Sequence, residues 1–463
     1  MSAPIYHIRD IALHARDVTL RLPFRFGDTE VRAAQEAYLR VTVEGPEGVQ
    51  KGTAAQLMVP RWFDKRPALD NDATVAELKA TLGSVARLAP GRSGTVARLG
   101  GELRASVRDD LPPDTPGLAA GFGPALLEAA LIDAACRGAD LPFVAAARAD
   151  IFGLVEAAPD WLGADAMQAA LADLHTPDRM MIRHTVGYGV PLTAADVTDR
   201  PTDGQPVALQ DVIGAWGVRA FKIKLKGDPE ADIAWLERVA AILAPLGPGL
   251  KISLDANEQY APESFADFTA RLTAAPALAG LRADLLFVEQ PFPRELSLVA
   301  AHPVSADVPI VIDEADDAPD ALYRALALGW SGSSVKSCKG VLRAVQNFAL
   351  ARRRAAEGRP IILTSEDLTC QPGLSWQQDT LMAAAIGATH SERNGHYFAG
   401  GMQGASDAEK AAFLSRHGDI YRDGPAGPQL RITDGRVAIG SLDCTGFGAA
   451  VQPDLASTPE LEF

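Results

Sequence analysis

Five short segments in the second half of the chain each carry a residue that can bind a metal ion or transfer a proton. Four of them begin with an apolar or β-branched run and end in charged residues, and the fifth reads as a short strand. Strands of this kind, separated by helix-length stretches, predict a (β/α)8 barrel of the TIM type, in which catalytic groups lie at the C-terminal ends of the strands. The segments are FKIKLK (221–226), KISLDAN (251–257), LLFVEQP (285–291), PIVIDEA (309–315) and SSVKSCKG (333–340).

The alternation of strand-like and helix-like stretches extends beyond these segments. It begins with a strand expected at 185–192 and ends with a weaker strand at 388–394, so that eight strands are expected. The runs are apolar on both faces, which is typical of a buried parallel sheet. Between Asp228 and Leu246, apolar residues recur at helical spacing, and Asp228-Pro229 fits a helix N-cap and first turn. The eighth helix has no clear pattern.

The first part of the chain has a different pattern, that of an α+β domain. Residues 5–60 predict a β-meander of four strands, and helical patterns follow at 70–88 and 122–150. The stretch 89–121 is rich in Gly, Pro and Arg and predicts loops, whereas 150–181 predicts a further helical insertion.

The barrel pattern stops after Gly400. The segment LRITDGRVAIG (430–440) contains an Asp-Gly turn signal and predicts a hairpin that returns to the first domain. We therefore expect an N-terminal α+β capping domain at 1–180, a catalytic barrel at 181–400 and a C-terminal segment at 401–463 that packs on the capping domain.

The formal net charge of −15 argues against a polyanionic partner, because the field of the protein would repel nucleic acid and no basic stripe overrides it. The N-terminus meets charge at Arg9 and Asp10 before any signal-like apolar core, and no apolar run of transmembrane length is expected. The four cysteines show no CxxC spacing, which indicates reduced thiols. A cytoplasmic protein without a nucleic-acid or membrane partner is therefore expected.

Three of the barrel segments carry a carboxylate after their apolar run, namely Asp255, Glu289 and Asp313. If these segments are successive strands, the three side chains reach the same mouth, where convergent acids repel one another unless a cation is present. Carboxylate ligands without Cys or His favour Mg²⁺, with Mn²⁺ as the second choice, over Zn²⁺. Asn257 would point the same way as Asp255 and add a ligand or support one. The alternative is that each acid is a loop cap or a surface charge.

Lysines accompany these carboxylates. Lys222, Lys224 and Lys226 share one face of their strand. Lys336 comes from a strand expected across the barrel. Burial and neighbouring ammonium groups lower the pKa of a lysine, which favours an amine base near neutral pH. Two bases on opposite faces of a substrate suit proton removal next to a carboxylate, with a metal stabilising the enediolate that forms. Lys226 and Lys339 are expected to be solvated charges.

The ordered set F-K-I-K, L-D-A-N, V-E-Q-P, I-D-E and V-K-S-C-K-G resembles the enolase superfamily, in particular the muconate-lactonizing-enzyme-like branch of the mandelate racemase/muconate lactonizing enzyme family. The resemblance covers residues 180–395 and extends more weakly to 125–143, which looks like the last helix of the family's capping domain. It implies that Asp255, Glu289 and Asp313 bind Mg²⁺.

The resemblance also implies roles for the lysines. Lys224 would be the base on one face of the substrate, Lys222 would tune it, and Lys336 would be the base on the other face. Family habit further implies a homo-oligomer. The chain departs from the family pattern after Lys336, where the usual double glycine is missing. No histidine occurs in PIILTSED (360–367), which disfavours the mandelate-racemase branch with its His/Asp base pair.

In this superfamily, loops of the first domain close over the barrel mouth and select the distal part of the substrate. Candidate loops here are 22–30 and 58–65, in which Arg25 and Arg61 could bind a second anionic group bidentately. Aromatic residues of the same loops, Phe24, Phe26, Trp62 and Phe63, could exclude water. The alternative is ordinary packing between the domains.

Acidic residues near the expected mouth are further candidates for substrate binding. Together with Asp367, they could hold an ammonium group or sugar hydroxyls, which would favour an amino-acid, dipeptide or polyhydroxy-acid substrate. They could equally form salt bridges with Arg393 or Lys336. The candidates are Glu314, Glu366 and Glu392.

These observations predict an Mg²⁺-dependent enzyme that abstracts the α-proton of a small carboxylate substrate, first of all a racemase or epimerase that uses both lysines. A lyase (acid dehydratase) or a cycloisomerase would use the same site, with one lysine only stabilising charge. A lysine Schiff-base aldolase needs no metal and leaves the carboxylates unexplained. A catalytically inactive barrel acting as a binding protein predicts the loss of a ligand or a lysine, and all of them are present.

Overall fold

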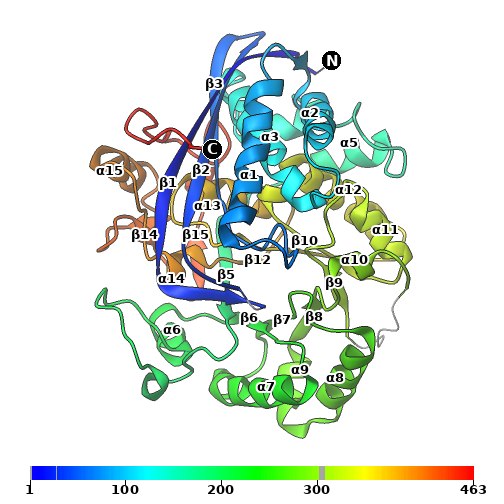
Figure 1. Ribbon diagram of the computed structural model, residues 1–463, viewed down its shortest axis with the longest axis vertical. Helices are drawn as coiled ribbons and strands as arrows, with labels where there is room; N and C mark the ends of the chain where they lie inside the picture. Colours follow the sequence, from blue (N-terminus) through cyan, green and yellow to red (C-terminus); the bar gives the residue numbers. More distant parts are fainter. Residues whose placement is uncertain (1–2, 28, 302–307) are drawn as a thin grey trace.

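The computed structural model describes residues 3–27, 29–301 and 308–463. Its centre is a ring of eight parallel strands that pair in the order β11-β10-β9-β8-β7-β6-β5-β12 (Figure 1). A backbone bridge between Glu366 and Glu392 joins the ends of β11 and β12 and completes the ring. The expected barrel is thereby confirmed. The strands are β5 (Arg179–Val186), β6 (Ala220–Lys224), β7 (Lys251–Asp255), β8 (Leu285–Glu289), β9 (Ile310–Ile312), β10 (Gly332–Val335), β11 (Ile362–Ser365) and β12 (His390–Glu392).

Helices follow the barrel strands, as the alternating pattern predicts. The predicted cap of α7 is confirmed, since the Asp228 side chain accepts a hydrogen bond from the Ala231 N–H and Pro229 lies in the first turn. The helix directly after β12 is the short α14, which agrees with the weak pattern there. The helices are α6 (Leu209–Trp216), α7 (Pro229–Leu243), α8 (Pro262–Ala274), α9 (Ala279–Ala283), α10 (Arg294–Ser297), α11 (Ala321–Ala327), α12 (Val341–Ala356), α13 (Leu374–Ala385) and α14 (Gly395–Phe398).

The first barrel strand begins earlier than predicted. β5 covers 179–186, whereas most of the expected strand at 185–192 lies in turns rich in Gly and Pro, which disfavour the interior of a strand. The predicted helical insertion at 150–181 is also wrong in extent. It holds one helix, α5 (Ala164–Asp173), and then enters β5.

The capping domain contains a four-stranded antiparallel sheet with helices on one side (Figure 1). The first two predicted strands form one strand of 21 residues, β1, so the predicted division of the meander is wrong there. Its pairing with β2 has register shifts between Ile8 and Asp10 and between Thr19 and Phe24. The strands are β1 (Tyr6–Phe26), β2 (Thr29–Gly45), β3 (Gly48–Leu57) and β4 (Ser93–Gly94).

A helix lies where the sequence predicts loops. The side chain of Thr95 caps this helix, α2, by accepting a hydrogen bond from the Arg98 N–H, and its apolar residues are buried at helical spacing. The glycine content of 89–121 therefore led to a prediction of loops where the chain forms an amphipathic helix. The helices of this part are α1 (Asn71–Leu88), α2 (Val96–Asp110), α3 (Gly117–Gly138) and α4 (Phe143–Arg148).

The helix α3 is the one described helix that is long and apolar enough to cross a membrane by length and composition, contrary to the expectation from the sequence. Every residue of its most apolar window is buried inside the protein. It packs against β3 so closely that a Cβ added at Gly52 would lie 2.1 Å from the Ala130 carbonyl oxygen. Packing in the capping domain thus accounts for its composition.

The C-terminal segment contacts both domains. The predicted turn forms, with Asp434 and Gly435 at φ of 50° and 68°, but the strand after it, β15, pairs with β5 of the barrel. The expectation that this hairpin returns to the first domain is therefore wrong. The end of the chain does lie against the capping domain, where His14 bridges to Glu460. The elements are α15 (Asp407–Arg416), β13 (Tyr421–Arg422), β14 (Gln429–Leu430) and β15 (Arg436–Ala438).

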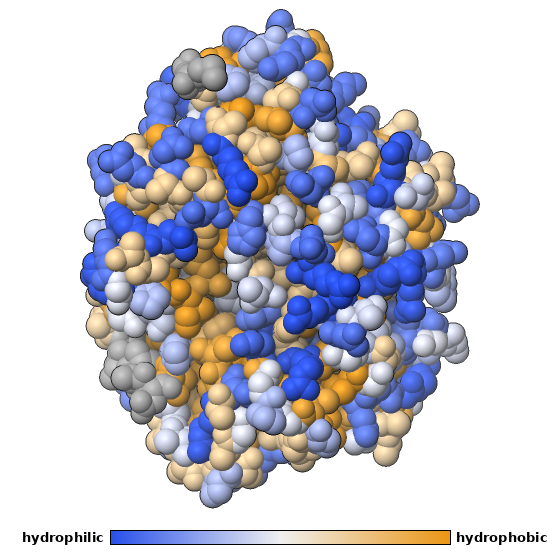
Figure 2. Space-filling model, turned by 180° about the vertical axis from the view of Figure 1, so that it is seen from behind, coloured by the Kyte–Doolittle hydropathy of each residue, from blue (hydrophilic) through white to orange (hydrophobic). Residues whose placement is uncertain are grey.

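The surface is mixed in character. The face in Figure 2 shows hydrophilic residues in most places, with hydrophobic residues exposed between them. Large exposed hydrophobic residues of the described chain are few and come from both domains. They are Ile5, Val49, Leu296, Val299, Tyr323 and Phe463.

Buried histidines predict a loss of stability in acid. Burial lowers the pKa of His184 and of His396 to about 3, so the unfolded chain binds protons first as the pH falls from 6.5 to 3. Each histidine should then cost about 1.4 kcal/mol of stability per pH unit. We expect the His184→Phe variant to lose less of its thermal midpoint than the parent between pH 7 and pH 4.5. An equal loss in both proteins would contradict this, and the exposed His175→Phe variant is the control.

Candidate active site

The barrel strands bring charged side chains to one end of the ring. Lys224, Asp255 and Glu289 are register partners on β6, β7 and β8, so their side chains leave the sheet at the same level. Each is the last residue of its strand, as the sequence predicts for Asp255 and Glu289, whereas β6 ends two residues before the predicted end at Lys226. All three are buried, with exposed fractions of 6%, 0% and 0%.

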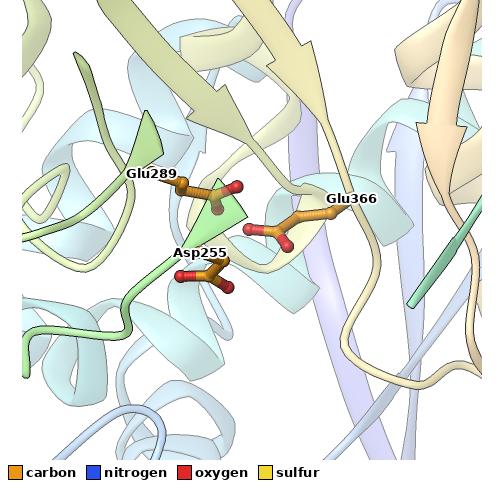
Figure 3. A group of neighbouring side chains, drawn as sticks. All are labelled: Asp255, Glu289 and Glu366. Carbon is orange, nitrogen blue, oxygen red and sulfur yellow. The ribbon is translucent and has the colours of Figure 1, made fainter. Parts of the chain in front are cut away.

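A carboxylate from the far side of the ring completes a compact acidic group (Figure 3). Asp255, Glu289 and Glu366 each offer an oxygen, and these oxygens lie within 4.8 Å of one another. The sequence predicts Glu366 only as a substrate-binding residue, because its distance from Asp255 depends on how the ring closes.

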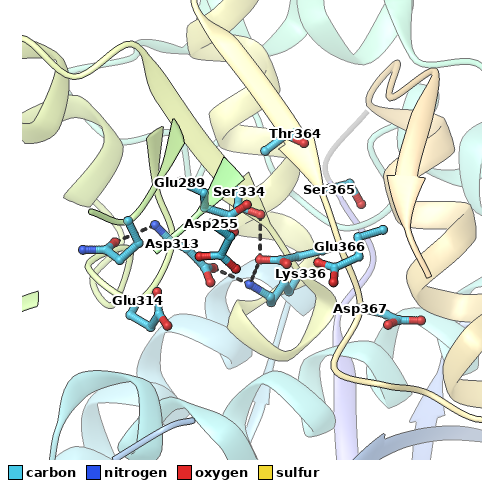
Figure 4. A network of polar contacts seen from close by, with 12 residues as sticks. Asp255, Glu289, Asp313, Glu314, Ser334, Lys336, Thr364, Ser365, Glu366 and Asp367 are labelled. Atoms are coloured by element: carbon cyan, nitrogen blue, oxygen red, sulfur yellow. Dashed lines mark hydrogen bonds and ion pairs between the residues drawn. The ribbon is translucent and has the colours of Figure 1, made fainter. Parts of the chain in front are cut away.

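Asp313, the third predicted metal ligand, lies just after β9 and contacts two lysines, of which Figure 4 labels Lys336. It accepts hydrogen bonds from Lys336 Nζ and from Lys339 Nζ, the latter at 2.8 Å. Lys339 also donates to the carbonyl oxygens of Asp313 and Ser334 at 2.6 Å and 2.8 Å. The expectation that Lys339 is solvated is wrong, because a one-turn 3-10 helix at 337–339 folds it back into the site, where it is 3% exposed.

Lys222 lies at the centre of the acidic group. Its Nζ forms ion pairs with Asp255 at 2.9 Å, with Glu289 at 3.1 Å and with Glu392 at 2.8 Å. A fourth ion pair joins it to Glu366. Lys222 therefore balances part of the negative charge that four strands bring together.

The carboxylates reverse the predicted direction of the lysine pKa shifts. Burial lowers the pKa of Lys222, but the four surrounding carboxylates raise it by more and hold it well above its usual range. Burial likewise lowers the pKa of Lys336, and Asp313 and Glu366 raise it by more. The prediction that burial and neighbouring ammonium groups lower the pKa of these two amines towards neutral pH is thus wrong.

Glu289 shows that the donor set fits a divalent cation. Its side chain is fully buried and shares the Lys222 ammonium group, at 3.1 Å from Oε2, with three other carboxylates, and within the described residues neither of its carboxylate oxygens accepts a hydrogen bond. Burial and the charge of Glu366 raise the pKa of Glu289 well above its usual range, and the same two causes raise that of Asp313 to about 6. A buried carboxylate without hydrogen bonds is costly unless it is neutralised or bound to a metal. An all-oxygen set of this kind suits Mg²⁺.

Lys224 and Lys336 line one small cavity at the end of the ring. β6 and β10 are four positions apart in the ring of eight strands, so the two lysines come from opposite sides. Lys224 Nζ donates hydrogen bonds to Asp255 Oδ2 at 2.6 Å and to Asn257 Oδ1 at 2.8 Å. A small molecule in the cavity would therefore lie between two amines.

The capping domain covers this cavity with the two segments that the sequence singles out. Phe24 and Phe26 line the cavity, but they lie at the end of β1, so the prediction of a loop over 22–30 is wrong there; position 28 lies outside the described residues. Trp62 of the second loop lines it too, with its ring centre 4.6 Å from Lys336 Nζ. Phe63 instead packs on Phe122 of α3, with ring centres 5.1 Å apart.

The two arginines predicted to bind a distal anion lie outside the cavity lining. Arg25 is exposed and forms an ion pair with Glu30 at 2.5 Å. Arg61 donates to backbone oxygens of its own loop, including that of Leu69. Neither placement supports a role in substrate binding.

The acidic candidates divide between the cavity and its surroundings. Glu366, Asp367 and Glu392 line the cavity, whereas Glu314 is buried and is not part of the lining. The salt-bridge alternative holds for Glu366, which pairs with Lys336. Asp367 turns away from Lys336 (Figure 4) and lies 3.8 Å from Arg393, while burial raises its pKa to about 8.

Two further residues in and around the site, Ser334 and Lys65, are not predicted from the sequence. Ser334 donates a hydrogen bond to Glu366 at 3.0 Å, and it shares a strand face with Lys336, so alternation could have identified it. Lys65 reaches from the capping domain to Glu258 and Glu314 at 2.6 Å and 3.2 Å. The only sequence signal for Lys65 is its position in 58–65, a segment that is predicted to close over the barrel mouth.

Comparisons with known proteins agree with this architecture. The family model described as Enolase C-terminal domain-like matches residues 207–455, a little over half of the chain. No curated protein matches the chain in a sequence search.

Solved structures share the whole fold at low identity. The dipeptide epimerase from Methylococcus capsulatus, complexed with Mg and the dipeptide L-Arg-D-Lys, is 19% identical, with a TM-score of 0.59 over 96% of this chain and 99% of that chain. The muconate lactonizing enzyme from Pseudomonas fluorescens, complexed with muconolactone, is 16% identical, with a TM-score of 0.60 over 98% and 99% of the two chains. The L-Ala-D/L-Glu epimerase from Bacillus subtilis is 17% identical, with a TM-score of 0.59 over 96% and 98%.

Proposed function

Because this chain belongs to the mandelate racemase/muconate lactonizing enzyme family of the enolase superfamily, we propose that it is an Mg²⁺-dependent enzyme that removes the α-proton of a small carboxylate substrate. The observation that carries the proposal is the pair Lys224 and Lys336, which flank one cavity from opposite sides of the ring beside a group of buried carboxylates. Two amines across a cavity suit proton removal on one face of a carbon and proton delivery on the other.

Mg²⁺ would be held by Asp255, Glu289 and Asp313. Asp255 and Glu289 are supported by their place in the compact acidic group, and Asp313 by its position after the next strand. When bound, the cation would supply positive charge to the substrate carboxylate and so lower the cost of negative charge that develops when the α-proton leaves.

Lys224 is the proposed base on one face. Its Nζ already contacts Asn257 Oδ1 and Asp255 Oδ2, which fix the direction of the amine. Lys336 is the proposed acid on the other face, where the Trp62 ring covers its ammonium group and limits access of water. Lys222 would balance the charge of the carboxylates between them.

Racemisation or epimerisation is the reaction that we favour, because both lysines line the cavity and both can carry a proton. Three of the structural neighbours are epimerases, two named dipeptide epimerase and one L-Ala-D/L-Glu epimerase, and the acidic Glu392 in the cavity lining would suit an ammonium group. A dehydratase or cycloisomerase would use the same site, and the test below separates these reactions. The homo-oligomer that the resemblance implies stays a prediction, which light scattering checks.

The test is an incubation with Mg²⁺ and single stereoisomers of dipeptides, N-acylated amino acids and sugar acids. Chiral chromatography should reveal the epimer of one class, formed without loss of mass. Formation of an unsaturated or 2-keto acid with loss of water would instead establish a lyase. A ring-closed isomer would establish a cycloisomerase.

The identity of the third metal ligand gives a separate prediction. If Asp313 is the ligand, Asp313→Asn should weaken Mg²⁺ binding by ~10-fold or more, as loss of a charged ligand does, whereas Glu366→Gln should change it less. Isothermal titration with Mg²⁺ measures both variants. The reverse order would assign the third position to Glu366, which lies in the compact group.

A further inference from the structure

The loop between β3 and α1 is tied to the barrel by buried ion pairs. Lys65 Nζ lies 2.6 Å from Glu258 Oε2 and 3.2 Å from Glu314 Oε1, and it donates a hydrogen bond of 3.0 Å to the Asn257 carbonyl oxygen. Arg294 donates to Glu258 at 2.9 Å and to the backbone oxygens of the same loop. The side chains of Glu258 and Glu314 are 6% and 0% exposed and that of Lys65 is 24% exposed, so the carboxylates of these contacts are shielded from water and the lysine is partly buried.

Lys65 is also connected to the proposed base, Lys224, by a chain of hydrogen bonds. Glu314 Oε1 accepts hydrogen bonds from Lys65 Nζ and from Asn257 Nδ2, both at 3.2 Å. The amide nitrogen of Asn257 is the donor in this contact, so it faces Glu314, and the amide oxygen faces the other way. That oxygen, Asn257 Oδ1, accepts a hydrogen bond of 2.8 Å from Lys224 Nζ. The orientation of the amide is therefore set from the side of the capping domain.

The backbone at this point is held in an unfavourable conformation. Asn257 and Glu258 have φ values of 44° and 73°, in the left-handed region that non-glycine residues seldom adopt. Such a conformation persists only where surrounding contacts hold it, and it is concentrated at functional sites. Lys65 contacts the backbone of one of these residues and the side chain of the other.

We infer that Lys65 is a positioning residue, which couples the closed capping loop to the direction of the Lys224 amine through Glu314 and Asn257. This inference rests on the proposed function of Lys224 as a base. Docking of the loop brings the Lys65 charge to Glu314, and the Asn257 amide then presents its oxygen to Lys224. Opening of the loop removes the cation that fixes this chain of contacts, so the base is aligned only under a closed cap.

The test compares Lys65→Met with Arg66→Met. Arg66 is a matched control, because it is the next residue of the loop and forms three ion pairs, all within the capping domain. Lys65→Met should lower kcat for α-proton exchange by ~10- to 100-fold, with a change in KM of no more than ~3-fold, because a small displacement of a catalytic group is costly. Lys65→Arg should restore part of kcat, and Arg66→Met should match the parent enzyme.

Crystal structures of the two variants supply a readout that does not depend on activity. In Lys65→Met, the contact between Lys224 Nζ and Asn257 Oδ1 should be lost, and in Arg66→Met it should remain at 2.8 Å as in the parent. Retention of this contact in Lys65→Met, or a kcat within ~2-fold of the parent, would overturn the inference. If the parent enzyme exchanged no α-proton but the contact were lost, the coupling would stand and the proposed reaction would fall.

Discussion

Replacing Lys224 or Lys336 by alanine is expected to abolish net inversion of the substrate, with a loss of ~10³-fold or more, as is usual when a general acid or base is removed. Both amines line the cavity from opposite sides of the ring. Because each would serve one face of the α-carbon, each variant should still exchange the α-proton of at most one of the two epimers. Chiral analysis gives the inversion rate, and mass spectrometry in D2O gives the exchange of each epimer.

The control for this prediction lies on the same strand segment. Lys226, two residues beyond Lys224, is exposed, and its Nζ lies 5.2 Å from the ring centre of Tyr188, away from the cavity lining. Lys226→Ala should keep the activity of the parent. Circular dichroism must show that the Lys224 and Lys336 variants are folded, and full inversion activity in both of them would refute the two-base mechanism.

The second large effect is expected at the buried carboxylate of β8. Glu289→Gln should weaken Mg²⁺ binding by ~100-fold or more and abolish activity, because a neutral amide cannot replace a charged ligand in an all-oxygen site. The carboxylate is fully buried and, apart from its ion pair with Lys222 at 3.1 Å, has no hydrogen bond within the described residues, so its contribution lies in its charge. Calorimetric titration with Mg²⁺ measures the loss.

A control variant shows whether loss of a negative charge outside the site also weakens Mg²⁺ binding. Glu263 is an exposed acid in the first turn of α8, and Glu263→Gln should bind Mg²⁺ as the parent does. Unchanged Mg²⁺ affinity in Glu289→Gln would remove Glu289 from the proposed metal site and leave its burial unexplained.

The barrel and much of its site could be predicted because the decisive residues directly end apolar runs. Asp255 and Glu289 close β7 and β8 in sequence and in space, so strand ends alone locate them. The sequence pattern predicts β5 too late in the chain. The alternation of apolar and polar residues at 179–186 is interrupted by charged residues, and the residues after 186 that are expected to form the strand lie in turns. The helix α2 was missed because two glycines weaken its pattern.

The remaining features of the site depend on contacts between segments that are distant in the sequence. Glu366 joins Asp255 and Glu289 only when the ring closes between β11 and β12. Lys339 is buried because a one-turn helix reverses the chain after Lys336. The raised lysine pKa values have the same origin, since they require the number of neighbouring carboxylates, which the order of residues along the chain does not give.

The central claim is α-proton removal that needs both the cation and Lys224, and solvent-deuterium uptake tests it most directly. The protein is incubated in D2O with Mg²⁺ and pooled dipeptides, N-acylated amino acids, sugar acids and betaines, with parallel samples that contain EDTA or the Lys224→Ala variant. We predict a mass increase of one unit in a single class of acid, which is lost for one epimer in the variant and for both epimers with EDTA. Uptake that persists with EDTA, or no uptake in any acid, would contradict the claim.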